Sequence, residues 1–448
     1  MSRHLVLVGF LQAQNCTTIP AAWRHPEARH DVTTAEYYRH IGQVLEAGKF
    51  DLGFFDDRLA MPDMFGGDHR HTVENGIRCV KLDPTTVLTT MGMATSRLGL
   101  GATYSTTYYE PFHVARVFST LDHLTNGRAA WNVVTSVNDN EARNMGLDQA
   151  LDHDTRYDRA DEFMEVVHGH WDTWEADAIE ADRSTGLYAH GDRVHRLDHE
   201  GEHYRSRGPF TVPRTPQGHP VVIQAGQSGR GTRFAARWGE LLFVSQTRVD
   251  RAVEAAQATR AAIEEAGRDP SQVKLANLTF PVVGRTMAEA EDKQAAYDEL
   301  PNMIDDLSLL SEGLNFDFSG RDLDDPLSDD DLAEMTGIQG IRNAVLEASG
   351  KTNPSTRDFV QMSGRGRLAH PTVGGPTELA DHFEEWFTAG ACDGFVIGGT
   401  HMPGAFEDFV ELVVPELQRR GLFRTEYETS TLRGHLGIDL PERGAWKR

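Results

Sequence analysis

The sequence has little cysteine, no long apolar run and fewer basic than acidic residues. Its three cysteines, Cys16, Cys79 and Cys392, lie far apart in 448 residues, so we expect no disulfide framework and a reduced, cytoplasmic protein. No run of 18 apolar residues occurs and the amino terminus lacks the features of a signal peptide, so neither a membrane span nor secretion is expected. With a net charge of −24 and a pI near 5.2, the chain should repel nucleic acid.

Short apolar segments alternate, for the most part, with amphipathic helices. Near-continuous apolar strands of this kind are typical of a parallel sheet that is buried on both faces. We therefore predict a (β/α)₈ barrel with a C-terminal helical extension, and an open doubly wound sheet is the alternative. The eight predicted strands are residues 5–11, 50–55, 98–103, 129–134, 221–224, 241–244, 274–283 and 394–397.

Several helices are also predicted from periodicity. Thr33 and Glu36 have the spacing of a capping box at the start of a helix over residues 34–48. Further helices are expected over residues 84–95, 155–173, 231–238, 249–266 and 405–419.

Long insertions are expected within what we predict to be a single domain spanning residues 1–448. The insertion at residues 58–83 is rich in glycine, aspartate and histidine, and the one at residues 175–220 contains a predicted hairpin. The insertion at residues 305–375 is acidic and is expected to be irregular around Asp317–Asp331. Loops of this length are usually functional or disordered. The insertions are residues 58–83, 135–154, 175–220 and 305–375.

Polar side chains gather where the third and fourth predicted strands end. The third strand runs into Thr103 and three further hydroxyl-bearing residues, Tyr104, Ser105 and Thr106, and the segment from Trp131 to Ser136 also stops in polar residues. Because the carboxyl ends of parallel strands meet at one edge of a sheet or barrel, these side chains predict a ligand site there.

A glycine-rich turn follows the fifth predicted strand and opens a helix. Backbone N–H groups between Gly226 and Gly231 could hold a phosphate, and the Ser228 hydroxyl would be a further donor. An ordinary tight turn between strand and helix explains the same glycines equally well.

Three further positions are candidates for a site at a barrel mouth. Asp57 follows the second strand, His153 and Tyr157 share one helix face, and His25 lies beside Trp23 and Arg24 in the first loop. For Asp57 the alternative is a helix cap or a salt bridge with Arg58. For His153 and Tyr157 it is local capping by Asp152 and Asp154, and for His25 it is simple exposure. Arg24, Arg58 and Arg230 could attract an anionic substrate, although surface salt bridges would account for each of them.

The string His199-Glu-Gly-Glu-His203 matches a zinc-protease motif. That motif needs a helix, whereas Gly201 and the alternating residues around it predict a hairpin that turns at Gly201. The close pairs His69/His71 and His168/His170 are better explained as solvated surface. We therefore expect no metal site.

Taken together, the sequence resembles the flavin-dependent monooxygenases that include nitrilotriacetate monooxygenase component A and dibenzothiophene sulfone monooxygenase, within the bacterial-luciferase-like barrels. The resemblance covers nearly the whole chain and is weakest over residues 305–375. It rests on Ala22-Trp-Arg-His25, Gly48-Lys-Phe-Asp51, Tyr108 through Arg116, Leu121-Asp122, Asn126-Gly-Arg128, Trp131 to Ser136, Glu141-Ala-Arg-Asn144, His153 to Phe163, Arg207-Gly-Pro209, Val212-Pro-Arg214, Pro216-Gln-Gly218, Gln224-Ala-Gly226, Asp393-Gly-Phe395, Phe423 to Tyr427 and Thr431-Leu-Arg433.

The resemblance implies a site for reduced FMN at the carboxyl ends of the barrel strands. Family contacts to the flavin fall on Asp57, Thr103, His153, Tyr157 and Ser228, with Gly226 and Gly229 in the phosphate-binding turn and Asn132 as a further lining residue. His25 is a candidate for proton transfer, but family members with tyrosine at this point argue against an obligatory imidazole.

The resemblance also implies partners and a reaction class. No dinucleotide-binding fingerprint is present, so FMNH₂ is expected from a separate NAD(P)H-dependent reductase, and O₂ is the second substrate. A homodimer or homotetramer is expected, acting on a small xenobiotic that is an aminopolycarboxylate, an organosulfur compound or an aromatic. The alternatives are an F420-dependent oxidoreductase, a barrel metallohydrolase and a non-catalytic flavin-binding protein.

Overall fold

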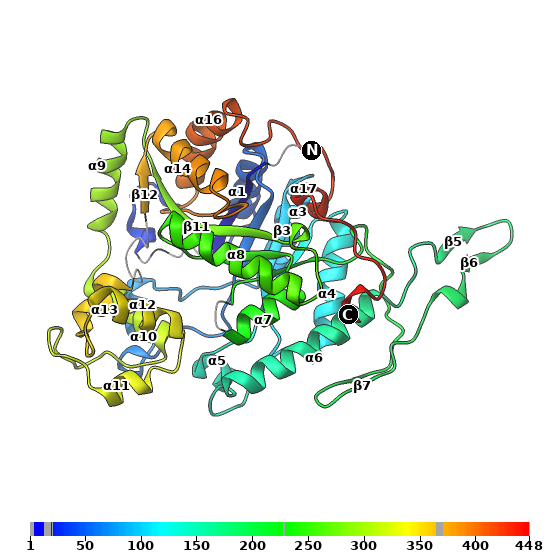
Figure 1. The fold of residues 1–448 in the computed structure, drawn as a ribbon, viewed down its shortest axis with the longest axis horizontal. Helices are drawn as coiled ribbons and strands as arrows, with labels where there is room; N and C mark the ends of the chain where they lie inside the picture. The colour runs from blue at the N-terminus through cyan, green and yellow to red at the C-terminus, as the bar shows by residue number, and fades with distance from the viewer. Residues whose placement is uncertain (1–3, 13–18, 20, 227–228, 364–370, 448) are drawn as a thin grey trace.

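A closed ring of eight parallel strands forms the centre of the computed structural model, which describes residues 4–12, 19, 21–226, 229–363 and 371–447 (Figure 1). The ring is closed by pairing of β10 with β11 and of β13 with β1, and this closure rules out the open sheet. The barrel prediction is therefore confirmed. The strands, in ring order, are β1 (Val6–Gln12), β2 (Leu52–Asp56), β3 (Gly99–Ser105), β4 (Ala129–Val134), β9 (Val221–Gln224), β10 (Leu241–Val244), β11 (Lys274–Val283) and β13 (Gly394–Gly398).

All eight predicted strands are present, with two departures from the prediction. β3 runs to Ser105 rather than stopping at Thr103. A ninth strand, β12 (Pro371–Gly374), pairs with the last residues of β11 and was not predicted. Its four residues contain a proline and two small residues, so no apolar run marks it.

Side chains alternate between the barrel interior and the surrounding helices. Val8, Leu52 and Ala130 belong to the inner apolar cluster, whereas Leu7, Phe55 and Trp131 belong to the cluster that packs under the helices. This period of two fixes which residue of each strand faces inward where the strand ends.

The amino-terminal end of the barrel is closed by the C-terminal extension. Leu432 and Leu436, from α17 (Leu432–Leu436), are buried in the inner cluster, and a side chain at Gly99 would collide with Leu432. The barrel is thus open only at its carboxyl end. The predicted helix over residues 405–419 is α15 (Gly404–Asp408), a π-helical turn (Phe409–Val413) and α16 (Val414–Arg419). Pro415 has no N–H to donate, which accounts for the interruption.

Helices cover the outside of the ring. α1 begins one residue later than predicted, because Thr34, not Thr33, caps it by accepting from the Tyr37 N–H. Pro111 starts α4, where its missing N–H costs nothing. The covering helices are α1 (Ala35–Ala47), α3 (Pro84–Ala94), α4 (Pro111–Leu124), α6 (His153–Trp171), α7 (Gly229–Trp238), α8 (Val249–Glu265), α9 (Met287–Asp298) and α14 (Pro376–Thr388).

The last insertion contains helices that were not predicted, whereas residues 315–328, most of the stretch around Asp317–Asp331 that was expected to be irregular, contain no helix. Asp305, Asp331 and Asp358 complete capping boxes with Asn302, Ser328 and Ser355. The segment also has an apolar cluster of its own. Its helices are α10 (Met303–Leu314), α11 (Asp329–Glu334), α12 (Gln339–Ser349) and α13 (Thr356–Met362).

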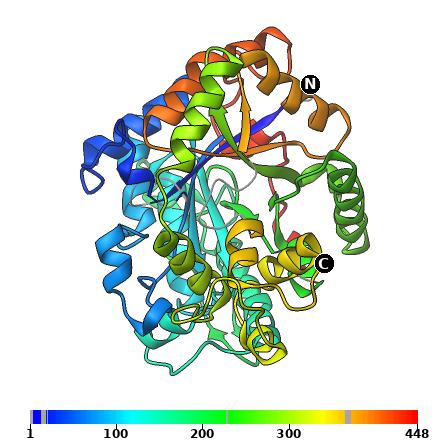
Figure 2. The same ribbon diagram turned by 90° about the vertical axis from the view of Figure 1, so that its left-hand side faces the viewer.

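The other insertions contain short elements. Figures 1 and 2 show α10–α13 on one side of the barrel, and in Figure 1 the β5–β6 hairpin projects from the opposite side. In the described part of the chain, no helix combines the length and the apolar character needed to cross a membrane. The remaining elements are η1 (Ala22–Arg24), η2 (Phe65–Gly67), α2 (Arg70–Asn75), α5 (Asp139–Asn144), β5 (Ile179–Asp182), β6 (Leu187–Ala189), η3 (Gly191–Arg193), β7 (His199–Glu200), β8 (Arg205–Ser206), η4 (Pro270–Gln272) and η6 (Ala445–Lys447).

Candidate active site

A polar layer lies inside the barrel at the carboxyl ends of β1 to β4. By the alternation described above, Gln12, Asp56, Thr103 and Asn132 face inward near the ends of these strands. They form two hydrogen-bonded pairs: Gln12 Nε2 donates to Asp56 Oδ2 at 2.9 Å, and Asn132 Nδ2 donates to Thr103 Oγ1 at 2.9 Å. The strands thus hold four polar groups in fixed orientation at the open end of the barrel.

An aromatic layer lies directly beneath these polar groups. Phe10 stacks on Phe54 with ring centroids 5.7 Å apart, and the edge of Phe54 meets Phe243 at 4.9 Å. With the α17 plug below, this layer closes the barrel interior to water from that side.

Asn132 has an acceptor that no protein group uses. The side chain is 5% exposed, and its Oδ1 atom has no hydrogen-bond partner among the described residues. A buried acceptor without a donor is costly, by about 1–3 kcal/mol, so Asn132 fits a ligand that offers an N–H at the mouth. The pyrimidine edge of a flavin is such a group.

Asp56, rather than the predicted Asp57, occupies the inward position at the end of β2. Leu52 and Phe54 face inward, so the alternation carries Asp56 to the same side. The pKa of Asp56 is lowered, because the nearby cations Lys81, Arg78 and Arg58 and the Gln12 hydrogen bond outweigh the effect of burial. Asp56 is therefore ionised at neutral pH.

Asp57 lies one residue beyond the strand. Burial raises its pKa to about 7, against the opposing attraction of Lys81, so this carboxyl group exchanges a proton near neutral pH. Its charge also raises the pKa of Tyr109, whose larger cause is burial. Asp57 stays a predicted flavin contact, and its carboxyl group can hold a proton at the mouth.

A narrow cradle lies where β9 meets α7. A side chain at Gly226 would lie 3.0 Å from the Tyr157 hydroxyl and 3.2 Å from the Gly231 Cα, so only glycine fits. Tyr157 is 7% exposed, and the Arg230 guanidinium lies 5.9 Å above its ring centroid. The structure therefore brings together Tyr157 and the glycine turn, as the phosphate site requires. Gly229 begins α7, and Ser228 lies outside the described residues.

His153 is the first residue of α6 and points toward this cradle side. Its ring centroid is 5.1 Å from that of Tyr157, and its Nδ1 is 2.8 Å from Asp154 Oδ1. Asp152 caps the helix through the Thr155 N–H, as expected for the alternative reading of this segment. The cap is made by Asp152 and leaves the His153 ring beside Tyr157, so His153 stays a predicted flavin contact.

His25 lies on the rim, beside residues that follow β13. Its ring stacks on His401 at a centroid distance of 3.9 Å, and Tyr297 is hydrogen-bonded to His401 Nδ1 at 3.0 Å. Burial lowers the pKa of both imidazoles, to about 3 for His401. The Glu27 N–H donates to His25 Nδ1, which leaves the proton of the neutral ring on Nε2.

His25, Glu27 and His401 are close enough to share a metal ion, the one such group found among the described residues. Coordination needs nitrogen lone pairs that converge in the ring planes. The two rings are stacked 24° from parallel, so their lone pairs lie side by side instead. The zinc-protease string is a hairpin, as predicted: β7 pairs antiparallel with β8, and His199 Nε2 contacts Glu162 Oε1 at 3.1 Å.

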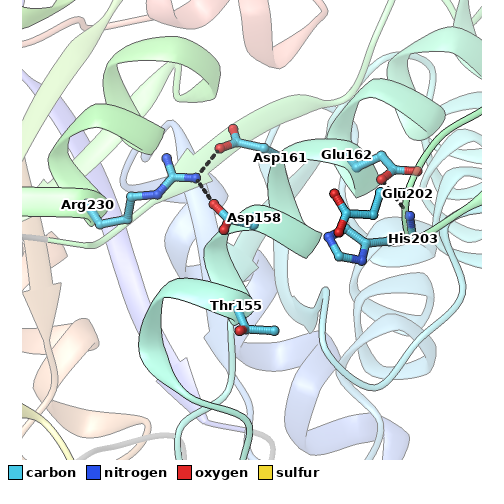
Figure 3. A pocket seen from close by; sticks show the side chains of 7 residues that line it. All are labelled: Thr155, Asp158, Asp161, Glu162, Glu202, His203 and Arg230. Atoms are coloured by element: carbon cyan, nitrogen blue, oxygen red, sulfur yellow. Dashed lines mark hydrogen bonds and ion pairs between the residues drawn. The ribbon is translucent and has the colours of Figure 1, made fainter.

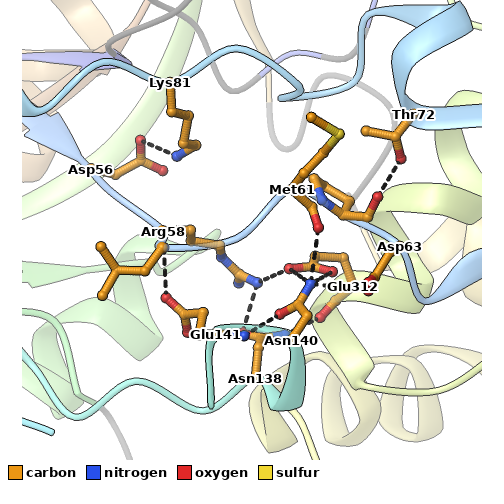
Figure 4. A network of polar contacts seen from close by, with 12 residues as sticks. Asp56, Arg58, Met61, Asp63, Thr72, Lys81, Asn138, Asn140, Glu141 and Glu312 are labelled. Carbon is orange, nitrogen blue, oxygen red and sulfur yellow. Dashed lines mark hydrogen bonds and ion pairs between the residues drawn. The ribbon is translucent and has the colours of Figure 1, made fainter. Parts of the chain in front are cut away.

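A network of buried polar groups joins three insertions above the mouth (Figure 4). Arg58 Nη1 lies 3.0 Å from Glu312 Oε1 and 2.8 Å from Asn138 Oδ1, and Asn140 Nδ2 donates to both Glu312 oxygens. Glu141 accepts from the Leu59 N–H at 3.0 Å. α10 is thus held over the mouth by Arg58 and α5.

The three arginines considered for attracting an anion are committed to protein carboxylates. Arg58 pairs with Glu312, Arg24 pairs with the buried Asp305, and Arg230 pairs with Asp158 and Asp161. Arg230 lines a pocket of about 390 Å³ that lies between α6 and the β7–β8 hairpin (Figure 3). Its other lining residues are Thr155, Asp158, Asp161, Glu162, Glu202 and His203.

Sequence reasoning missed Gln12, Asp56 and Glu312. Strict alternation from Phe10 and Phe54 would have found the first two, since each is two residues beyond an inward phenylalanine. Glu312 comes from a helix whose position over the mouth has no local signature in the sequence.

These features define a class of protein: a parallel (β/α)₈ barrel whose mouth combines a glycine-rich turn beside Tyr157 with a polar layer over an aromatic layer. Residues 20–393 match the model of the luciferase-like monooxygenase family. The chain is 42% identical to dibenzothiophene-sulfone monooxygenase of Rhodococcus erythropolis, over 98% of each chain. It is 39% identical to nitrilotriacetate monooxygenase component A of Aminobacter aminovorans, over 95% of each. A crystal structure of a riboflavin lyase, with modified FMN and riboflavin, superposes with a TM-score of 0.87 at 32% identity, covering 98% of this chain and 96% of that one.

The chain belongs to the luciferase-like monooxygenase family, and it is a flavin-dependent monooxygenase. The family resemblance seen in the sequence is thereby confirmed.

Proposed function

We propose that the protein is the oxygenase component of a two-component system, which takes FMNH₂ from a separate reductase and oxidises a small organic molecule with O₂. The observation that carries the proposal is the buried Asn132 Oδ1, without a partner among the described residues, beside Thr103 at the mouth. Gly226 follows β9, the strand next to the one that carries Asn132, and this is the side on which a flavin phosphate would lie.

Each part of the site has a task in this proposal. Tyr157, Ser228 and the amides between Gly226 and Gly229 would hold the phosphate, with His153 beside them. Thr103, Asn132 and Asp57 would lie nearer the ring. When bound, reduced flavin supplies the electrons for O₂ activation, by which one oxygen atom enters the substrate and the other leaves as water.

The protein itself controls water and protons. Phe10, Phe54 and Phe243 exclude water from beneath the mouth, and the network of Arg58, Glu312 and α5 closes it from above. Asp57, with its pKa raised to about 7, can hold or release a proton there. His25 is proposed as a second proton carrier through Nε2, with Tyr297 and His401 fixing its position.

Partners follow from the family. The reductase would be a separate NAD(P)H-dependent protein, and we propose a homodimer or homotetramer in the cytoplasm. The relatives are named for a sulfone and for nitrilotriacetate, so the proposed substrate is a small organosulfur, aminopolycarboxylate or aromatic compound.

A product screen tests the proposal directly. Purified protein is mixed with FMN, NADH, O₂ and a purified flavin reductase, together with aminopolycarboxylates, sulfones and halogenated aromatics, and products are identified by mass spectrometry with ¹⁸O₂. Incorporation of one ¹⁸O atom into a product is expected. Reduction of substrates with reduced F420, and no oxygen uptake with reduced FMN, would instead support the F420-dependent alternative.

A further inference from the structure

Arg78 is a cation at the site that has no carboxylate of its own. Its side chain is only partly exposed, and among the described residues it makes no hydrogen bond or ion pair; its Nε atom is buried without a partner. The nearest charges are Asp56, Arg58 and Glu312, and burial lowers the pKa of Arg78. An arginine does not lose its proton in response to burial, so its charge persists at the mouth.

The two carboxylates near Arg78 make their contacts with other residues, and Asp56 Oδ1 is itself buried without a hydrogen-bond partner among the described residues. Glu312 is 2% exposed and is held by Arg58 and Asn140. Asp56 accepts from Gln12 and has Lys81 Nζ at 3.8 Å from its Oδ1. Figure 4 shows Lys81 and Asp56 on one side of the network and Arg58 with Glu312 on the other. Arg78 is therefore a partly desolvated cation that no carboxylate of the described residues contacts, and a bound anion would supply the missing partner.

Lys81 is a second cation whose N–H donors are unused among the described residues. Its side chain is 13% exposed, its Nζ atom has no hydrogen-bond partner, and its separation from Asp56 exceeds a hydrogen bond. Burial lowers its pKa, while Asp56 and Asp57 oppose this effect. Two cations with unused N–H donors thus lie within three residues of each other.

The segment that carries Arg78 is rigidly mounted. Gly76 ends α2 in the left-handed region, and a side chain there would lie 2.6 Å from Trp23 Nε1. Ile77 is 1% exposed, and its N–H donates to the Thr72 carbonyl. Arg78 itself has a φ of 50°, a strained conformation for a residue with a side chain. Strain of this kind, kept by firm surroundings, is typical of functional positions.

The position of Arg78 separates it from the phosphate cradle. Arg78 lies in the insertion that follows β2, whereas the cradle follows β9, three strands round a ring of eight. One cofactor phosphate held at Gly226 and Tyr157 would leave Arg78 free for another anion. The network around Arg58 lies next to it, under α10.

We propose that Arg78, assisted by Lys81, binds a carboxylate of the substrate, so that this enzyme oxidises a small organic anion. The assignment rests on the proposed function, since it places the substrate beside the flavin. A planar guanidinium pairs well with a carboxylate through two parallel N–H donors. Binding of a substrate carboxylate would also explain why the other arginines at the mouth pair with protein carboxylates and Arg78 does not.

Binding of matched acids and esters tests the proposal without knowledge of the natural substrate. The probes are nitrilotriacetate and thiodiacetate, each compared with its fully methylated ester, by calorimetry in metal-free, low-salt buffer. The unaltered protein should bind at least one acid about tenfold or more tightly than its ester. Arg78→Met should abolish that preference, and Arg78→Lys should keep part of it. Arg70→Met, at a side chain that is 77% exposed on α2, should keep it fully.

Reduced-FMN affinity, measured by anaerobic titration, separates this proposal from the one on which it rests. It should be the same in Arg78→Met and in the unaltered protein. A selective loss of reduced-FMN binding in Arg78→Met would assign the cation to the flavin and overturn the substrate assignment. Esters that bind as well as acids, acids that do not bind, or an acid preference that survives Arg78→Met would also overturn it. If the unaltered protein binds an acid but no reduced FMN, the proposed function fails and the anion site stands.

Discussion

At the scale of single residues, the site depends on atoms left without protein partners. Asn132 donates to Thr103 and keeps a free acceptor, while Tyr157 sets the width of a cradle that admits only glycine. On the proposed function, a bound flavin would supply the partner that Asn132 Oδ1 lacks among the described residues, so substitutions there should affect binding more than folding.

Asn132→Leu should weaken reduced-FMN binding with little loss of stability. Leucine has nearly the same volume but no acceptor, and an acceptor of this kind contributes about 1–3 kcal/mol, or roughly 5- to 150-fold in affinity. Anaerobic fluorescence titration measures the change. Asn144→Leu, at an exposed asparagine of α5, is the matched control, and equal affinities in both variants would remove Asn132 from the flavin site.

Asp57→Asn should alter the pH dependence of stability in a defined direction. Because burial raises the pKa of Asp57 from 3.8 to about 7, the folded protein holds a proton between these values that the unfolded chain has lost. This carboxyl group therefore makes the protein less stable as pH rises from about 4 to 7, and its effect is constant above pH 7.

Asparagine cannot ionise, so the variant should match the unaltered protein at pH 4 and exceed it at pH 8, by at most about 4 kcal/mol. Urea unfolding at both pH values gives the difference, with the exposed Asp292→Asn as control. A variant less stable at pH 8 than the unaltered protein would contradict the raised pKa. The same substitution should flatten any inflection near pH 7 in kcat/KM.

At the scale of secondary structure, the barrel strands could be predicted from the sequence, but the contacts between the insertions above the mouth could not. Each barrel strand is a continuous apolar run buried on both faces, so local composition marks it, and β12 was missed because it is not such a run. Thr103, Asn132 and Tyr157 could be found because strand ends and helix faces are local. Asp56 was missed through an error of one residue in register.

The contacts between these insertions have no signature in the nearby sequence. Arg58 and Glu312 are 254 residues apart in sequence, and nothing near either residue in the sequence indicates that they meet. Only the folded chain brings the insertions together.

Arg58→Met should loosen the insertion over the mouth. It leaves Glu312 buried without its cation, which costs about 3–5 kcal/mol when one partner of a buried pair is removed. Thermal unfolding and limited proteolysis between residues 305 and 362 report the effect. The double variant Arg58→Met/Glu312→Leu should recover much of the loss, whereas equal damage in both variants would show that the ion pair is not what holds α10.

At the scale of the whole molecule, the barrel is sealed at one end and open at the other. Leu432 is fully buried beneath the inner layer, so Leu432→Ala should cost about 2–5 kcal/mol in unfolding free energy. Leu440→Ala, at a side chain that is 62% exposed, should change it by no more than about 0.5 kcal/mol. Chemical denaturation distinguishes the two, and a tolerated Leu432→Ala would mean that the plug does not contribute to the core.

The sealed barrel also leaves one entrance for flavin, substrate and O₂, and we expect the reduced flavin to come from a separate reductase. A nicotinamide would have to enter the same mouth to reduce a bound flavin, and the sequence carries no dinucleotide-binding fingerprint that would hold it there. We therefore expect the protein with NADH, FMN and O₂ to consume no NADH above the rate of buffer. Adding a catalytic amount of a purified flavin reductase should start NADH oxidation and, with a substrate found in the product screen, product formation. Photochemically reduced FMN should replace reductase and NADH together, because the oxygenase needs only the reduced flavin. Rapid NADH oxidation by the protein alone would contradict this division of labour, and it would require a nicotinamide site at the same mouth.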